Sequence, residues 1–121
     1  MIRGIGVDVL ALKRLQGYEG RWNDSFFTAM FTERERAEAL ERDEPLRYFA
    51  GRFAAKEAVA KALNAHGIAV EFPQIETLAG PHGAPETQVT GDAAAASGIA
   101  LHVSISHEDD FVLAFAVAEE C

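Results

Sequence analysis

The sequence predicts an α+β fold with one domain over residues 1–121, in which a long central helix packs on a small antiparallel sheet. Residues 46–65 are rich in alanine and leucine, and their large apolar side chains recur at helical spacing. Residues 2–9 are apolar and rich in β-branched side chains, as strands are. After Gly67 the chain consists of short apolar runs between turn residues, which is typical of strands and hairpins. A chain of 121 residues has room for one core only.

The first strand is interrupted by two glycines. Gly4 and Gly6 lie inside residues 2–9, which indicates a strand that another part of the molecule approaches closely. Residues 10–30 follow a loose helical pattern with a break near residues 17–20. We therefore expect irregular helical structure after the strand.

Two further helices have clear start signals. Thr32 and Glu35 have the spacing of a capping box, so a helix is expected to begin there and to run to about Arg42. Pro45 suits the first turn of the next helix, because its missing amide hydrogen has no partner at that position. The helix over residues 46–65 is the best supported element of the chain.

The second half of the chain predicts strands. Residues 75–89 predict a hairpin around a centre rich in glycine and proline. Asp92 can cap a small alanine-rich helix that stops at Gly98. Residues 101–106 and 111–117 predict two strands joined by an acidic turn.

Charge and cysteine content restrict the function. The net charge of -8 argues against nonspecific binding to nucleic acid or to an anionic membrane. All eleven Lys and Arg residues lie within residues 1–61, so a polyphosphate site must take its permanent cations from there. The single cysteine, Cys121, excludes an intrachain disulfide and fits a reducing compartment. With no apolar stretch of about 18 residues, we expect a cytoplasmic protein.

Three places carry polar groups that a simple fold would not need. Asp8 stands in an apolar run, so it either caps the next helix or holds a metal ion. Glu57 and Lys61 are four residues apart, which suits either a solvated ion pair or a site on one helix face. His107 ends a predicted strand beside acidic residues and is either a turn residue or a functional one.

Four segments together resemble the holo-acyl-carrier-protein synthases in order and spacing. They are residues 4–8 (GIGVD), residues 31–35 (FTERE), residues 50–58 (AGRFAAKEA, followed by Lys61 and Ala62) and residues 102–108 (HVSISHE). The resemblance extends from residue 2 to about residue 119. It implies a 4'-phosphopantetheinyl transferase-like fold and an enzyme that moves 4'-phosphopantetheine from coenzyme A to a serine of apo acyl carrier protein, releasing adenosine 3',5'-bisphosphate.

The resemblance also implies roles for individual residues. Asp8 and Glu57 would ligate magnesium, an ion that suits carboxylate oxygens and substrate phosphates. With Lys61, which would act as general base or stabilise charge, they form the implied catalytic set. The implied contacts to coenzyme A are Arg52, His82, Gly83, Pro85, Ser106 and His107. The family packs as a homotrimer with its sites between subunits, and Ser106 and His107 would reach coenzyme A from a neighbouring subunit.

Two loops depart from the family pattern. Residues 64–67 replace a loop similar to Gly-Thr-Gly near the pyrophosphate, and Ala84 replaces a frequent basic residue. Both changes affect segments implied to touch coenzyme A. They make these loops the least predictable parts of the site.

A docking surface for the carrier follows from charge. Acyl carrier proteins are acidic, so an acidic enzyme needs a local positive patch to bind one. Residues 1–24 hold four basic residues and three acids. The candidate contacts are Lys13, Arg14 and Arg21.

Two alternative functions stay open. One is transfer to the carrier domains of polyketide or peptide synthases. The other is a non-catalytic module on the same scaffold that binds a nucleotide or a carrier. The short chain favours the trimeric type of enzyme over the longer transferases, which resemble two such units fused.

Overall fold

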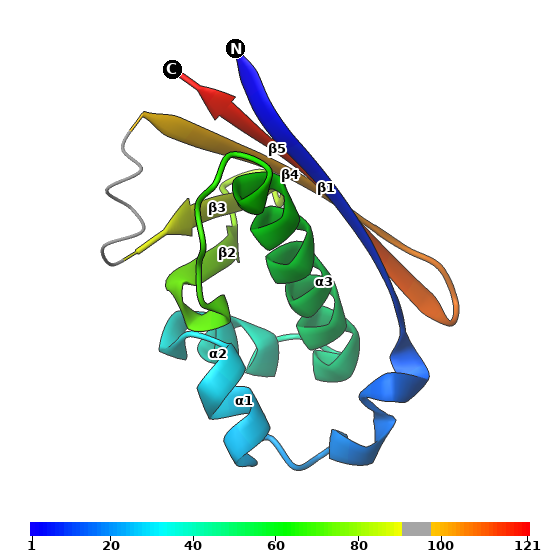
Figure 1. Ribbon diagram of the computed structural model, residues 1–121. Coiled ribbons are helices and arrows are strands. Elements are labelled where there is room, and N and C mark those ends of the chain that lie inside the picture. Colours follow the sequence, from blue (N-terminus) through cyan, green and yellow to red (C-terminus); the bar gives the residue numbers. More distant parts are fainter. Residues whose placement is uncertain (91–97) are drawn as a thin grey trace.

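The fold is a long helix that lies across one face of a three-stranded antiparallel sheet (Figure 1). The computed structural model describes residues 1–90 and 98–121. The sheet has the order β1-β5-β4, with β1 at Ile2–Ala11, β4 at Ile99–His107 and β5 at Phe111–Glu120. The helix α3 (Pro45–Asn64) contacts all three strands. The predicted α+β architecture is confirmed, whereas the small helix predicted after Asp92 lies outside the described residues.

Small side chains allow β1 and α3 to approach each other closely. A Cβ atom on Gly4 would lie 2.0 Å from the carbonyl oxygen of Ala62, and one on Gly6 would lie 2.0 Å from that of Ala58. The same inner face of β5 carries only Ala114, Ala116 and Ala118 between residues 114 and 118, all fully buried. The sequence predicts a close approach at the two glycines, and the approaching element is α3.

The two predicted helix starts are confirmed. α3 begins with Pro45 and runs for 20 residues, burying a stripe of alanines together with Val59 and Leu63. α2 (Glu33–Leu40) begins with a complete capping box: the Thr32 hydroxyl accepts from the Glu35 amide at 3.1 Å, and the Glu35 carboxylate accepts from the Thr32 amide at 2.9 Å. α2 ends two residues before the predicted Arg42.

Residues 10–30 are less helical than their pattern suggests. β1 continues to Ala11, two short 3-10 turns follow (η1 at Leu12–Arg14, η2 at Gln16–Tyr18), and only α1 (Ser25–Met30) is α-helical. The aromatic side chains that mimic a helical period belong to a second core cluster. Its buried members include Phe27, Phe31 and Phe49, and the partly buried Trp22 and Phe26 pack against it.

A separate hairpin lies on the side of α3 away from β1 (Figure 1). After the 3-10 turn η3 (Phe72–Gln74), it consists of β2 (Ile75–Ala79) and β3 (Pro85–Val89), close to the predicted bounds. Gly83 has a φ of 85°, which favours glycine in the turn. None of the helices in residues 1–90 and 98–121 is long and apolar enough to cross a membrane.

A buried ion pair joins α2, α3 and β2. Lys56 Nζ lies 2.8 Å from Glu35 Oε1, and both side chains are fully buried. Lys56 also donates to the carbonyls of Phe72 and Ile75, while Glu35 accepts from the Thr77 amide at 2.9 Å. Burial lowers the pKa of Lys56, and the carboxylate of Glu35 opposes this effect. The network explains residues 31–35 as a structural motif, because breaking a buried pair leaves an uncompensated charge.

Candidate functional site

Asp8 and Lys61 meet where β1 crosses α3. Asp8 is two residues beyond Gly6 on the same face of the strand and is half-buried. Lys61 Nζ lies 3.7 Å from Asp8 Oδ1 and donates to the Val7 carbonyl at 2.9 Å. The next helical turn, η1, is preceded by Ala11 and has no side-chain cap. Asp8 is therefore a strand residue, and the alternative of a helix cap is wrong.

The carboxylate of Asp8 is held in an environment that disfavours its charge. Burial raises the pKa of Asp8, and the nearby charges of Lys61 and Arg14 oppose the rise without overcoming it. A carboxylate of this kind gains from any additional cation, such as a metal ion.

Glu57 lies one helical turn before Lys61 on α3 and is half-buried. Its side chain forms neither a hydrogen bond nor an ion pair within residues 1–90 and 98–121, so the alternative of a Glu57–Lys61 ion pair is not found there. Lys61 instead pairs with Asp8. In the same residues no group of three or more His, Cys, Asp or Glu side chains could hold a metal. Any metal here would depend on these two acids and on ligands from the substrate and water.

A pocket of about 350 Å³ lies at the other end of α3 and brings together three residues implied to bind coenzyme A. They are Arg52 from the middle of α3, Gly83 from the hairpin turn and His107 from the end of β4. The other lining residues are Arg42, Asp43, Glu44, Arg47, Tyr48 and Ala79. The cluster of arginines around a histidine suits an anionic ligand.

Arg52 is held rigidly at the wall of this pocket. Its Nε donates to the Thr77 carbonyl at 3.0 Å, and Nη2 lies 3.4 Å from Glu38 Oε1. The guanidinium carbon lies 4.2 Å from the centre of the Tyr48 ring, within the range of a cation–π contact. Burial raises the pKa of the Tyr48 hydroxyl, against the opposing charge of Arg52. Arg52 thus presents a fixed positive charge.

His107 faces α3, whereas its neighbour Ser106 faces the opposite side of the sheet. A Cβ atom on Gly51 would lie 3.3 Å from His107 Nε2, so the ring lies directly over this glycine. Burial lowers the pKa of His107, and the charges of Arg47 and Arg52 lower it further. Ser106 is exposed and does not line the pocket, and neither do His82 and Pro85 beside Gly83. The structure therefore brings together only some of the implied contacts.

The predicted docking residues occupy three different environments. Arg14 lines a hollow of about 190 Å³ whose other walls are mostly apolar, and its charge acts on Asp8. Lys13 lines a different hollow with Asp109 and Asp110. Arg21 is engaged by Asp24 at 2.9 Å. Of the three, Arg14 alone combines its positive charge with a hollow lined mostly by apolar side chains.

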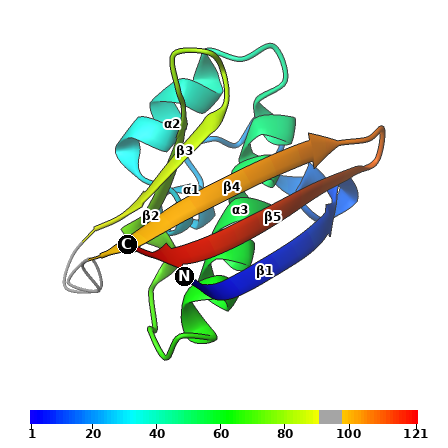
Figure 2. The ribbon, with the colours of Figure 1, turned by 90° about the horizontal axis from the view of Figure 1, so that it is seen from above.

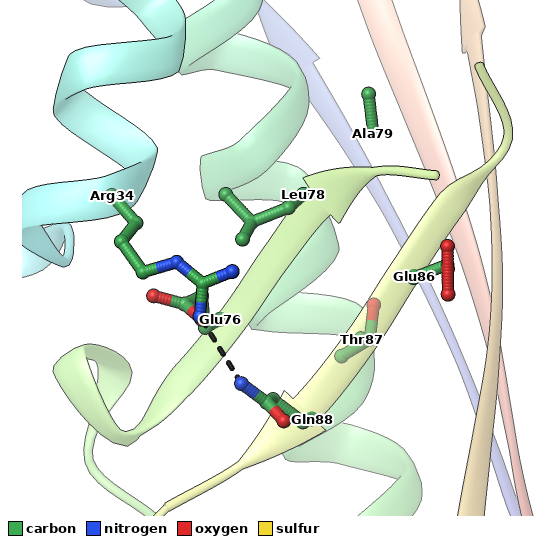
Figure 3. A pocket seen from close by; sticks show the side chains of 7 residues that line it. All are labelled: Arg34, Glu76, Leu78, Ala79, Glu86, Thr87 and Gln88. Carbon is green, nitrogen blue, oxygen red and sulfur yellow. Dashed lines mark hydrogen bonds and ion pairs between the residues drawn. The ribbon is translucent and has the colours of Figure 1, made fainter. Parts of the chain in front are cut away.

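A further hollow of about 300 Å³ on the hairpin contains none of the predicted site residues (Figure 3). Its centre is Glu76, which accepts hydrogen bonds from the Thr32 hydroxyl at 2.7 Å, from Arg34 at 3.3 Å and from Gln88 at 3.0 Å. Because Glu76 is already saturated with donors, we interpret this hollow as a structural junction between α2 and the hairpin.

The loop after α3 uses its backbone amides internally. The amides of Ala65 and His66 donate to the carbonyls of Lys61 and Leu63, and those of Gly67 and Ile68 donate to Asn64 and Leu63. In this conformation these amides are not free to bind a pyrophosphate. The sequence departure at residues 64–67 thus has a structural counterpart. Ala84 is exposed in the hairpin turn and brings no charge to it.

Six residues that line the pocket were not predicted from the sequence: Arg42, Asp43, Glu44, Arg47, Tyr48 and Ala79. Helical spacing could have indicated two of them. Tyr48 is four residues before Arg52, and Arg47 is four residues before Gly51, so each shares a helix face with a residue of the recognised motif.

Comparison with known proteins shows the family of the chain. The sequence profile of the 4'-phosphopantetheinyl transferase superfamily matches residues 4–116. The chain belongs to this superfamily. Among its members, the holo-[acyl-carrier-protein] synthase of Halothermothrix orenii is 36% identical, with 99% of both chains covered.

Solved structures of the superfamily extend the similarity to the fold. The holo-[acyl-carrier-protein] synthase of Neisseria meningitidis has a TM-score of 0.82 and 36% identity, covering 99% of this chain and 100% of its own. The Bacillus anthracis synthase, solved in complex with CoA (3',5'-ADP), has a TM-score of 0.80 and 32% identity, covering 100% and 99%. The transferase fold implied by the sequence resemblance is confirmed.

Proposed function

We propose that this protein is a holo-acyl-carrier-protein synthase that transfers 4'-phosphopantetheine from coenzyme A to a serine of apo acyl carrier protein. The observation that carries the proposal is the pairing of Asp8 with Lys61 at the crossing of β1 and α3, with Glu57 one turn away. We call these three residues the metal half-site. Arg52, Gly83 and His107 form the nucleotide half-site. Relatives are named for this activity, and one was solved with coenzyme A.

In this proposal the two half-sites of one chain serve different active sites. Arg52 and Lys61 are nine residues apart on α3, which is two and a half turns, so they point to opposite sides of the helix. A single coenzyme A molecule cannot follow one face of α3 from one half-site to the other. We infer that the metal half-site of one subunit is completed by the nucleotide half-site of a neighbour.

The outer face of the sheet supports the homotrimer that this arrangement requires. Figure 2 looks onto this face, with α3 behind the strands. Val7 pairs with Phe115, and Val9 pairs with Leu113, and all four side chains are 38–56% exposed. With Ile5 they form a continuous apolar surface, of a kind that usually marks an interface. Ser106 pairs with Leu113 and faces the same side, which agrees with a contact across subunits.

The two carboxylates of the metal half-site suit magnesium. Magnesium usually binds through one or two protein carboxylates and completes its shell with water and substrate phosphates. Asp8, partly desolvated, and Glu57, without an ion-pair partner in the described residues, match that donor set. A bound magnesium ion would neutralise charge on the pyrophosphate.

The chemistry that we propose is an in-line transfer at phosphorus. The carrier serine oxygen forms a bond to the β-phosphorus, the bond to the adenosine 3',5'-bisphosphate oxygen breaks, and the serine proton is lost to water or substrate. Lys61 acts as donor toward Val7 and lies beside Asp8. These contacts suit a residue that stabilises charge on the phosphate better than one that accepts a proton.

The carrier docks, in this proposal, next to Arg14, with Lys13 and Arg21 as outer contacts. The hollow beside Arg14 is lined by Leu10, Leu15, Tyr18, Phe26 and Phe53. Positive charge at its rim and apolar walls inside suit the acidic, partly apolar helix on which a carrier presents its serine. The cytoplasmic location expected from the single cysteine belongs to the same proposal.

The test is direct transfer. The protein is incubated with apo acyl carrier protein, coenzyme A and magnesium, and the carrier is weighed by mass spectrometry. We expect a mass increase of one phosphopantetheine group, and no increase when magnesium is chelated or when Asp8→Ala replaces the wild type. A carrier that binds the protein but stays unmodified would favour the non-catalytic module. Modification of the carrier domains of polyketide or peptide synthases, without modification of acyl carrier protein, would favour a transferase for those synthases.

A further inference from the structure

Arg47 lines the nucleotide half-site, but its guanidinium is turned to the backbone of the β4–β5 turn. Nη1 donates to the Glu108 carbonyl at 2.9 Å, and Nη2 donates to the Asp109 carbonyl at 3.3 Å. Its Nε lies 3.6 Å from the exposed carboxylate of Glu44. The planar fork of an arginine suits two consecutive carbonyls in a way that a lysine cannot match. Arg47 therefore links the start of α3 to a turn 61 residues later.

Two backbone hydrogen bonds hold the same turn together with Arg47. The Glu108 amide donates to the Phe111 carbonyl at 2.8 Å and closes the turn. The Leu12 amide, at the end of β1, donates to the Asp110 carbonyl at 2.9 Å. Together with Arg47, these groups give every carbonyl from residue 108 to residue 111 a donor. The three acidic side chains of the turn repel one another, which a nearby cation offsets.

The same face of α3 also supports the ring of His107. Gly51 is four residues after Arg47, so both residues lie on one side of the helix. The His107 ring lies over Gly51, as the 3.3 Å distance to a Cβ atom built there indicates. One helix face thus holds the turn through Arg47 and leaves room for the imidazole at Gly51.

We propose that Arg47 is a positioning residue for coenzyme A binding: it holds the β4–β5 turn against α3 and thereby fixes His107 in the nucleotide half-site. The proposal rests on the proposed function, because that function makes this pocket the nucleotide half-site. Arg47 differs from Arg52 in this assignment. Arg52 is anchored to Thr77 and Glu38 through Nε and Nη2, and its Nη1 forms no hydrogen bond within residues 1–90 and 98–121, whereas both terminal nitrogens of Arg47 are engaged by the turn.

Two substitutions distinguish the paired hydrogen bonds of the Arg47 guanidinium from its positive charge. Arg47→Gln removes both, and Arg47→Lys keeps the charge but cannot bond both carbonyls in the same way. We expect Arg47→Gln to raise the KM for coenzyme A by about fivefold to tenfold, with kcat at saturating coenzyme A changed less than about twofold. Arg47→Lys is expected to lose most of the same affinity. Arg34→Gln, the same change in charge at the hollow of Figure 3, is the matched control and should leave the KM unchanged.

A second measurement needs no coenzyme A. In the free protein, amide hydrogen exchange at Glu108 and at Leu12 should become faster in Arg47→Gln and in Arg47→Lys, and the NMR signals of the His107 ring should shift. Unchanged exchange together with an unchanged KM overturns the proposal. An Arg47→Lys variant that behaves like wild type overturns it as well, because charge alone would then account for the effect.

The same assays distinguish this proposal from the proposed function. If Arg52→Ala and His107→Ala weaken binding of coenzyme A while Arg47→Gln does not, only the role of Arg47 is wrong. If none of the three changes the KM, the pocket is not the nucleotide half-site and the proposed function has lost its binding site.

Discussion

The carboxylate of Asp8 is placed where its charge opposes folding. It lies on the inner face of β1, and burial raises its pKa in spite of Lys61 and Arg14. A raised pKa in the folded state means that the carboxyl group favours the fold fully only below its unfolded pKa, and that this contribution is lost as the pH rises through the folded pKa. At neutral pH the ionised side chain is a local source of instability, which is a common property of functional residues.

Asp8→Asn should therefore stabilise the free protein while abolishing transfer. Asparagine keeps the shape of the side chain but removes the poorly solvated charge. At pH 7 we expect a higher thermal midpoint than wild type and transfer reduced by at least about a hundredfold. The two midpoints should approach each other as the pH falls through the folded pKa of Asp8, and they should converge below its unfolded pKa of about 3.8. Thermal unfolding followed by circular dichroism, at pH 7 and in the acidic range, checks this prediction. A variant less stable than wild type at pH 7 would contradict the pKa argument.

At the scale of elements, small residues on α3 and β1 determine how the helix packs against its neighbours. Its alanines and the glycines of β1 bring two backbones into contact, and this contact places Asp8 beside Lys61. Gly51 leaves room for His107 on another face. Small residues thus set the geometry of both half-sites.

Gly6→Ala tests the contact between β1 and α3. The new Cβ atom would lie 2.0 Å from the Ala58 carbonyl oxygen and 2.9 Å from Lys61 Cβ, so the strand must move away from the helix. We expect a loss of about 1–3 kcal/mol in the free energy of unfolding, together with a large loss of transfer. Gly17→Ala is the control, because a Cβ atom there meets nothing within 4 Å. Urea unfolding of both variants decides, and equal stabilities would show that the crossing tolerates a side chain.

The sequence predicts the elements that depend on local signals and misses those that depend on distant contacts. The capping box at Thr32 and the proline at the start of α3 act within a few residues, so both helix starts were predictable. The aromatic residues between 22 and 31 repeat as if in a helix because they pack on Phe49, which no local pattern reveals. The contact of Arg47 with residues 108 and 109 is likewise invisible until the chain has folded.

At the scale of the whole molecule, the proposed function gives one chain two half-sites that face away from each other. Arg52 and Lys61 lie on opposite sides of α3, and an exposed apolar surface covers the outer face of the sheet. The family resemblance alone implied a trimer with shared sites. The geometry of α3 adds a physical reason for that proposal, since a folded monomer would separate Arg52 from Lys61, which we propose act on one coenzyme A molecule.

Mixed trimers of two inactive variants provide the decisive test of shared sites. Asp8→Ala removes the metal half-site and leaves the nucleotide half-site intact, whereas His107→Ala does the reverse. We expect each active site to combine half-sites from two neighbouring subunits. When equal amounts of the two variants are refolded together, half of the subunits carry each intact half-site, so about a quarter of the active sites receive both. The mixture should therefore regain about a quarter of the wild-type rate at limiting coenzyme A. If each site belongs to one chain, every subunit stays defective and no activity returns. Light scattering confirms that the mixture is trimeric, and an active monomer would contradict the arrangement directly.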